Sequence, residues 1–303
     1  MHEFLAQLAN GVELGAIYAL IALGYTLVYG ILELINFAHG DVYTFGSFTA
    51  LVVLVALRAA NVLHGGGLIL GIVAALLVAI LACALLNAAI ERLAYRRLRK
   101  APRLAPLITA IGVSFMLENL IELWQGSAPV AFPNVIPNPE LSIGALQVGV
   151  QQIVVVALAI VTMIALHYFV QRSRLGKAMR AVAQDRDAAS LVGINVDRTI
   201  AITFLIAGAL AGVAGFVGGV SFGSAWFLNG FGAGLRAFTA AVLGGIGNIA
   251  GAMLGGFLIG LLESFSTWFI GGQWSNVAVF SVLILVLVFR PSGLLGESLP
   301  EKV

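Results

Sequence analysis

The stretch LILGIVAALLVAILACALLNAAIERLAYRRLRK, residues 68–100, decides the fold class of this chain. Its first 23 residues, 68–90, carry no charged side chain, and a helix needs about 20 apolar residues to cross a bilayer. The ten residues that follow contain five basic side chains. An apolar segment of spanning length that ends in a basic run is typical of a transmembrane helix flanked by a cytoplasmic loop.

The rest of the 303-residue chain has the same character, with 60% hydrophobic residues, 10% charged residues and a mean hydropathy of +1.04. A soluble domain carries about 25% charged residues, so this composition excludes a soluble protein. Apolar runs predict eight crossings, at residues 11–29, 42–57, 68–90, 104–124, 153–170, 200–220, 251–270 and 277–289. A ninth run, 237–246, is too short to span alone and ends in GGIGN, which is typical of a broken or re-entrant helix.

We therefore expect an all-α membrane protein, a polytopic helical bundle that forms a single transmembrane domain over residues 1–303. The first ten residues contain no Lys or Arg, and the apolar run behind them is too long for a signal peptide. The first hydrophobic segment is thus expected to remain as a helix. Pairs of glycines four residues apart recur along the chain, and this spacing predicts helices whose backbones pack closely. Such pairs include Gly11/Gly15, Gly208/Gly212, Gly215/Gly219 and Gly256/Gly260.

Two loops, 91–103 and 171–198, hold 12 of the 16 basic residues. These are Arg92, Arg96, Arg97, Arg99, Lys100 and Arg103 in the first loop, and Arg172, Arg174, Lys177, Arg180, Arg186 and Arg198 in the second. The positive-inside rule places both loops in the cytoplasm. The stretch 127–152 between them has four prolines and no basic residue, so it is expected outside. Counting three crossings back puts the N-terminus outside, provided that no helix is broken near Asn36.

The sequence gives no support to an enzyme, a cofactor or a metal site. Each of the three lysines, Lys100, Lys177 and Lys302, is followed by Ala or Val, so none can be the lysine of a phosphate-binding loop. The four histidines are scattered, and Cys83 is the single cysteine, so no metal-ligand spacing is formed. A net charge of +2 does not indicate a nucleic-acid partner. If ATP drives this protein, hydrolysis must occur on a separate polypeptide.

The second basic loop, RSRLGKAMRAVAQDRDAASLVGINVDR at residues 172–198, predicts a short surface helix. The helix would contain Ala188, Ala189, Leu191 and Val192, with Asp185 or Asp187 as its N-cap and Gly193 at its end. It would expose an apolar knob, formed by Leu191 and Val192. Because Arg180, Arg186 and Asp187 would surround this knob, the pattern indicates a docking surface for another protein. The alternative is an amphipathic helix that lies flat on the membrane.

The stretch GILELINFAHGDVYTFG, residues 30–46, places Glu33, Asn36, His39 and Asp41 within otherwise apolar sequence. Ionisable residues at membrane depth are costly, so they are functional candidates. In one interpretation the chain unwinds here, and the following helix points its positive N-terminal end into the protein. In the other, the stretch is a solvated loop in which Asn36 or Asp41 caps a helix.

Glu118 and Glu122 lie one helical turn apart on the fourth predicted crossing. Two carboxylates that are buried together could hold a proton between them. Residues near the end of a helix more often lie at the membrane interface, and this is the alternative for both glutamates.

Three stretches resemble the permease subunits of ABC importers for branched-chain amino acids. They are ALIALGYTLVYGILELINFAHGDVYTFGSF at 19–48, LGKAMRAVAQDRDAASLVGINV at 175–196 and AVLGGIGNIAGAMLGGFLIGLLE at 241–263. The last two are also similar to permeases for ribose-type sugars and nucleosides. NFAHGD, residues 36–41, is the stretch that favours amino acids.

The resemblance implies a permease in the bacterial cytoplasmic (inner) membrane that pairs with a second permease subunit. It also implies two ATP-binding subunits and a periplasmic substrate-binding protein. By resemblance, the ATPase-contact loop includes Gly176, Arg180, Asp185, Arg186, Asp187, Ala188, Ala189, Leu191 and Gly193, and the translocation pathway includes Asn36, His39 and Asp41. The alternatives are an ABC permease for a sugar, a nucleoside or a small amide such as urea, and a stand-alone channel or secondary transporter.

Overall fold

The computed structural model describes residues 2–63, 65–99, 101–102, 104–143 and 146–296. The helices are α1 (His2–Leu32), α2 (His39–Ala59), α3 (Gly66–Ile90), η1 (Glu91–Tyr95), η2 (Arg96–Leu98), α4 (Leu104–Gln125), α5 (Val150–Arg172), α6 (Arg174–Gln184), α7 (Arg186–Leu191), α8 (Val196–Phe222), α9 (Asn229–Gly244), α10 (Ile249–Ile270), η3 (Gly272–Trp274) and α11 (Ser275–Phe289). The strands are β1 (Val130–Ala131), β2 (Glu140–Ile143), β3 (Leu146–Gly149) and β4 (Ser224–Ala225). The strands form two small antiparallel pairs, β1 with β4 and β2 with β3.

Within these described ranges, eight helical stretches are long and apolar enough to cross a membrane. They are α1, α2, α3 together with η1 and η2, α4, α5, α8, α10, and η3 together with α11. The predicted polytopic helical bundle is therefore confirmed, and each of its eight predicted apolar segments lies in one of these helical stretches; α9 is a further, shorter passage.

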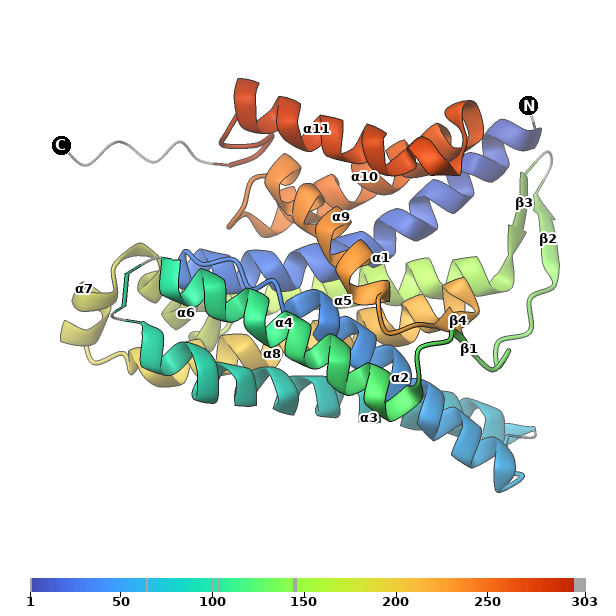
Figure 1. Cartoon of the computed structure of the whole chain (residues 1–303), viewed down its shortest axis with the longest axis horizontal. Coiled ribbons are helices and arrows are strands. Elements are labelled where there is room, and N and C mark those ends of the chain that lie inside the picture. The colour runs from blue at the N-terminus through green and yellow to red at the C-terminus, as the bar shows by residue number, and fades with distance from the viewer. Residues whose placement is uncertain (1, 64, 100, 103, 144–145, 297–303) are drawn as a thin grey trace.

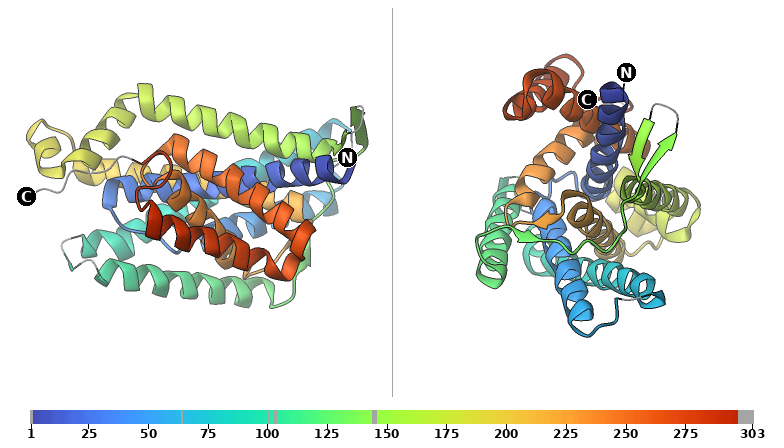
Figure 2. Two further views of the ribbon diagram at one scale, coloured as in Figure 1. Left: turned by 90° about the horizontal axis from the view of Figure 1, so that it is seen from above. Right: turned by 90° about the vertical axis from the view of Figure 1, so that its right-hand side faces the viewer.

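Helix α1 forms the centre of the bundle, because every residue from Ala16 to Leu23 is buried. It packs against α10, α8, α9 and α5, whereas α11 lies at the periphery in the end-on view of Figure 2. The α1–α10 contact rests on small residues: a Cβ added to Gly260 would collide with the backbone of Gly15, and one added to Gly256 would collide with Ala19. The predicted close packing of glycine-spaced helices is thus confirmed within this subunit.

The described parts of the two basic loops lie at one end of the bundle, and strands β1, β2 and β3 lie at the other. Figure 1 shows α6 and α7 at the left and the β2–β3 hairpin at the right. The first loop joins the second through Asp197, which accepts from Arg96 at 2.9 Å and also pairs with Arg99. This arrangement agrees with the prediction that both basic loops lie on the same side of the membrane.

Helix α9 carries the chain from one end of the bundle to the other, although its 16 residues span only about 24 Å. Just before α9, Ala225 pairs with Val130 at the hairpin end. Just after it, Gly247 approaches Gly30 near the end of α1. The N-terminal end of α1 and the C-terminal end of α11 consequently lie at opposite ends (Figure 1).

The predicted short helix at 237–246 needs a correction, because α9 begins eight residues earlier, at Asn229. Residues 229–236 contain three glycines and Arg236, which weaken both the apolar and the helical signals. Tertiary packing overrides this weakness: a Cβ on Gly230 would collide with the carbonyl oxygen of Gly40 in α2. The glycines therefore let α9 lie against α2.

Candidate functional site

The chain breaks between α1 and α2 over residues 33–38, starting at the exposed Glu33 and running inward to the buried Asn36 and Ala38. Asn36, His39 and Asp41 are only 1%, 0% and 1% exposed. The interpretation of a solvated loop is therefore wrong, and that of an unwound segment within the bundle holds. The predicted capping role of Asn36 or Asp41 is also wrong: α2 starts after Ala38, and no side chain in the described part of the chain caps it.

Asn36 fastens the unwound segment to distant helices. Its Oδ1 accepts a hydrogen bond from Tyr95 Oη at 2.8 Å, and its Nδ2 lies 3.5 Å from Asn87 Oδ1. Asn87 Nδ2 in turn donates to the Phe204 carbonyl at 2.7 Å. Buried amide groups need such partners, so the side chain of Asn36 holds the break against α3, η1 and α8.

His39 and Asp41 face the opposite way, toward α1 and α4. The His39 ring packs edge-on against Tyr25, with ring centroids 5.1 Å apart, and leaves no room for a side chain at Gly24. Asp41 Oδ2 accepts a hydrogen bond of 2.5 Å from Ser114 Oγ in the middle of α4. Glu118, one turn further along α4, is buried as well, whereas Glu122 is only half-buried. The two glutamates are therefore not buried together.

Tyr25 and Ser114 line an apolar cavity of about 210 Å³ between α1, α4 and α9. Its walls are formed by Tyr25, Phe37, Ile111, Ser114, Phe115, Gly230, Phe231, Gly234 and Leu235. We call it the central pocket. Asp41 lies directly behind its wall through Ser114, and His39 does so through Tyr25. Asn36 does not line it, although its neighbour Phe37 does.

The second basic loop folds into two helices whose caps follow the local sequence. Ser173 Oγ accepts from the Gly176 amide at 2.8 Å at the start of α6. Asp185 Oδ1 accepts from the amides of Asp187 and Ala188 at 2.9 and 3.0 Å at the start of α7. Gly193 follows α7 with φ +85°. The predicted helix and its end are confirmed, and of the two candidate caps the structure uses Asp185.

The exposed and buried faces of α7 divide the predicted docking residues. Leu191 and Val192 are 87% and 77% exposed, so the predicted apolar knob is confirmed. Ala189, which the resemblance assigns to the ATPase contact, is only 3% exposed, so its side chain faces the protein and not the surface of α7. Arg186 lies three residues before Ala189, hence on the same inward face. Its Nη2 donates to the Ile31 carbonyl at 2.8 Å instead of forming a charged rim.

Arg180 is also used within the chain, because its guanidinium donates to the Val170 carbonyl at the end of α5. Gly176 is buried where a Cβ would collide with that same carbonyl. Of the nine residues predicted for the contact, Asp187, Ala188, Leu191 and Gly193 are exposed without such an internal role. The available surface is therefore smaller than the sequence suggested.

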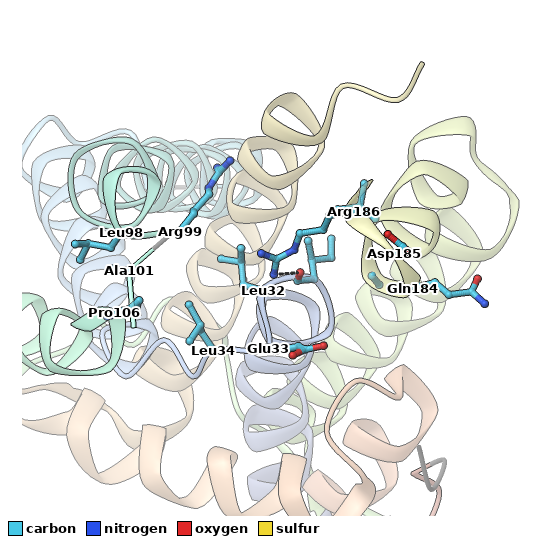
Figure 3. Close-up of a pocket in the computed structure, with 13 residues that line it drawn as sticks. Leu32, Glu33, Leu34, Leu98, Arg99, Ala101, Pro106, Gln184, Asp185 and Arg186 are labelled. Atoms are coloured by element: carbon cyan, nitrogen blue, oxygen red, sulfur yellow. Dashed lines mark hydrogen bonds between the residues drawn. The ribbon is translucent and has the colours of Figure 1, made fainter. Parts of the chain in front are cut away.

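A polar cavity of about 250 Å³ separates α7 from the end of α1. Figure 3 shows Glu33, Arg99, Asp185 and Arg186 around it, with Arg186 reaching across to the last turn of α1. Glu33 is the first residue of the unwound segment, and Asp185 caps α7. The two regions that the sequence singled out thus meet at this end of the bundle.

Residues 7–288 match the family described as branched-chain amino acid transport system / permease component. The chain belongs to this permease family. It is 44% identical to the high-affinity branched-chain amino acid transport system permease protein BraD of Pseudomonas aeruginosa, over 100% of this chain and 99% of the relative. It is also 44% identical to the high-affinity branched-chain amino acid transport system permease protein LivH of Escherichia coli, over 99% of this chain and 98% of the relative. No solved structure matches the chain.

The permease contains an internal ion pair that the sequence analysis missed. Arg236 Nε in α9 lies 3.2 Å from Glu263 Oε2 in α10, and the same carboxylate oxygen accepts from Tyr18 Oη at 2.7 Å. Arg236 Nη2 also donates to Asn276 Oδ1 in α11 at 2.8 Å. An arginine inside an apolar segment is costly without such partners, so this cluster fixes α9 to three neighbouring helices.

The sequence analysis also missed the two hydroxyl-bearing residues of the central pocket, Ser114 and Tyr25. Only Ser114 could have been found from a pattern in the sequence. Ser114, Glu118 and Glu122 are spaced four apart, which puts them on one face of α4. That polar stripe through an apolar helix points to Ser114. Tyr25 left no comparable signal, because an aromatic residue in an apolar helix is more often part of the core.

Proposed function

We propose that this permease is one transmembrane subunit of a bacterial ABC importer, and that it translocates branched-chain amino acids across the inner membrane. The observation that carries the proposal is the match over nearly the whole chain to proteins named as high-affinity branched-chain amino acid permeases. The similarity covers nearly all of each relative as well as nearly all of this chain, so we infer the same transport task.

In this proposal the other subunits of the transporter are separate polypeptides. A second permease subunit completes the pathway, two ATP-binding subunits drive it, and a periplasmic binding protein delivers the substrate. Loops 91–103 and 171–198 are then cytoplasmic, as their basic residues favour. The knob of Leu191 and Val192 projects from that end and supplies a small apolar contact of the kind that a docking interface needs.

Transport in this arrangement requires two states of the pathway, with different contacts in each. The polar cavity between α7 and the end of α1 supports a link between ATPase docking and the translocation pathway. Arg186 on α7 holds the last turn of α1, and the unwound segment that leads to the central pocket starts one residue after that turn. A shift of α7 on an ATPase would therefore act on the segment that leads directly to His39 and Asp41 in the first turn of α2.

Reconstitution tests the proposal. The permease is placed in liposomes together with its second permease, ATPase and binding protein, and ATP-dependent uptake of labelled leucine is measured. We expect uptake by the complete set and none by this chain alone. Uptake of a sugar, a nucleoside or urea with the matching binding protein, and not of leucine, would contradict the proposed substrate. Uptake by the isolated chain without ATP would identify a channel or secondary transporter.

A further inference from the structure

We propose that the central pocket receives the branched aliphatic side chain of the amino acid during translocation. This inference rests on the proposed function and deepens it, since it assigns a substrate contact to this subunit. The pocket is the cavity of about 210 Å³ bounded by α1, α4 and α9.

The size and lining of the pocket fit a branched aliphatic group. An apolar cavity of about 150 Å³ in another protein is large enough to bind benzene, so this pocket can hold a four-carbon side chain. Most of its lining is apolar and comes from the unwound segment, α4 and α9, with Phe37, Ile111, Phe115, Phe231 and Leu235. Sites for whole drug-sized ligands start at about 300 Å³. The pocket therefore suits one side chain better than a sugar or a nucleoside.

The pocket has few polar groups, and this determines which part of the amino acid can enter it. Tyr25 and Ser114 contribute the side-chain hydroxyls of the wall, and Ser114 already donates to Asp41. An ammonium or carboxylate group that is buried without partners is costly. The charged backbone groups of the amino acid consequently remain at the open mouth, and the aliphatic side chain points inward.

The position of the pocket is independent of its chemistry and leads to the same conclusion. Ser114 stands in the middle of α4, which places the pocket at mid-depth of that span. Two interrupted parts of the chain border it, the unwound segment at Phe37 and the first turn of α9 at Gly230 and Phe231. Irregular backbone is tolerated at membrane depth where it lines a cavity or is buried in protein. Transporters build substrate sites from such discontinuous helices near the midplane.

Changing the pocket volume tests the inference in the complete transporter. Ile111→Phe fills the pocket, Ile111→Ala enlarges it, and Ile108→Phe makes the first change one turn away on the exposed surface of α4. Uptake of leucine and of valine is measured separately, each at saturating binding protein. A methylene group in a fitted apolar pocket changes discrimination by about tenfold or more.

We expect Ile111→Phe to lower the leucine-to-valine uptake ratio by about tenfold and Ile111→Ala to raise it, while Ile108→Phe leaves it unchanged. An unchanged ratio in both Ile111 variants would overturn the inference and leave the pocket to lipid. An equal loss of both substrates, with less of the second permease co-purified, would overturn it in favour of a subunit contact. Failure of the wild-type transporter to move either amino acid would instead refute the proposed function.

Discussion

The unwound segment at 33–38 and the α7 helix differ in what determines their structure. In α7, each turn is set by neighbours in the sequence: Asp185 caps amides two and three residues later, and Gly193 ends the helix. In the unwound segment and the first turn of α2, the partners come from far away, since Asn36 bonds to Tyr95 and Asp41 to Ser114. Local rules therefore predict the first region, and tertiary packing decides the second.

The largest effect is expected where the first residue of α2, directly after the unwound segment, meets α1. Gly24→Val would drive its side chain into the His39 ring, so we expect a loss of about 3 kcal/mol in the free energy of unfolding. Thermal unfolding of the detergent-purified protein measures it. Gly112→Val is the matched control on α4, where no described atom beyond the adjacent backbone of its own helix lies within 4 Å of an added Cβ. Equal stability of the two variants would show that the His39 packing is looser than the structure has it.

A smaller loss is expected when the link to η1 is cut. Asn36→Ala leaves the buried hydroxyl of Tyr95 without its acceptor, which costs about 2 kcal/mol. Tyr95→Phe removes the other partner, and the double variant should cost less than the sum of the two. Additive losses in this double-mutant cycle would mean that the two side chains do not stabilise each other.

The effect of the local cap should be smaller still and confined to α7. Asp185→Ala removes the acceptor for two amides and should cost about 1 kcal/mol. Hydrogen exchange at the Ala188 amide reports it directly, and we expect faster exchange there with little change in α1. Asp187→Ala is the control, because the structure does not use Asp187 as the cap. Faster exchange in the control alone would reverse the assignment.

The smallest effect on stability is expected at the knob. Leu191→Glu alters an exposed side chain, so the free energy of unfolding should change by no more than about 0.5 kcal/mol. Co-purification of the ATPase should nevertheless fall, because a charge enters the proposed apolar contact. Gln171→Glu adds the same charge outside α7 and should leave ATPase binding intact. Undiminished binding in Leu191→Glu would place the docking contact elsewhere. Ala189→Glu cannot serve here, since it would disrupt α7 itself.

The same contrast explains how much the sequence could predict. Composition and residue spacing within short stretches of sequence predict three features. These are the eight apolar spans, the shared end of the basic loops and the Asp185 cap. The burial of Asn36 and Asp41 depends on helices that lie 50 or more residues away in sequence. The start of α9 was missed because its glycines are weak helix formers until α2 packs against them.

The ion pair between Arg236 and Glu263 has a consequence for how the protein is made. Arg236 stands in the middle of the 16-residue α9, and an arginine at such a position costs about 2.5–3.5 kcal/mol on entry from the translocon. A segment this short and this polar has little tendency to leave the translocon alone. We expect α9 to be retained there until α10 brings the carboxylate of Glu263, so that the two helices partition into lipid as one hairpin.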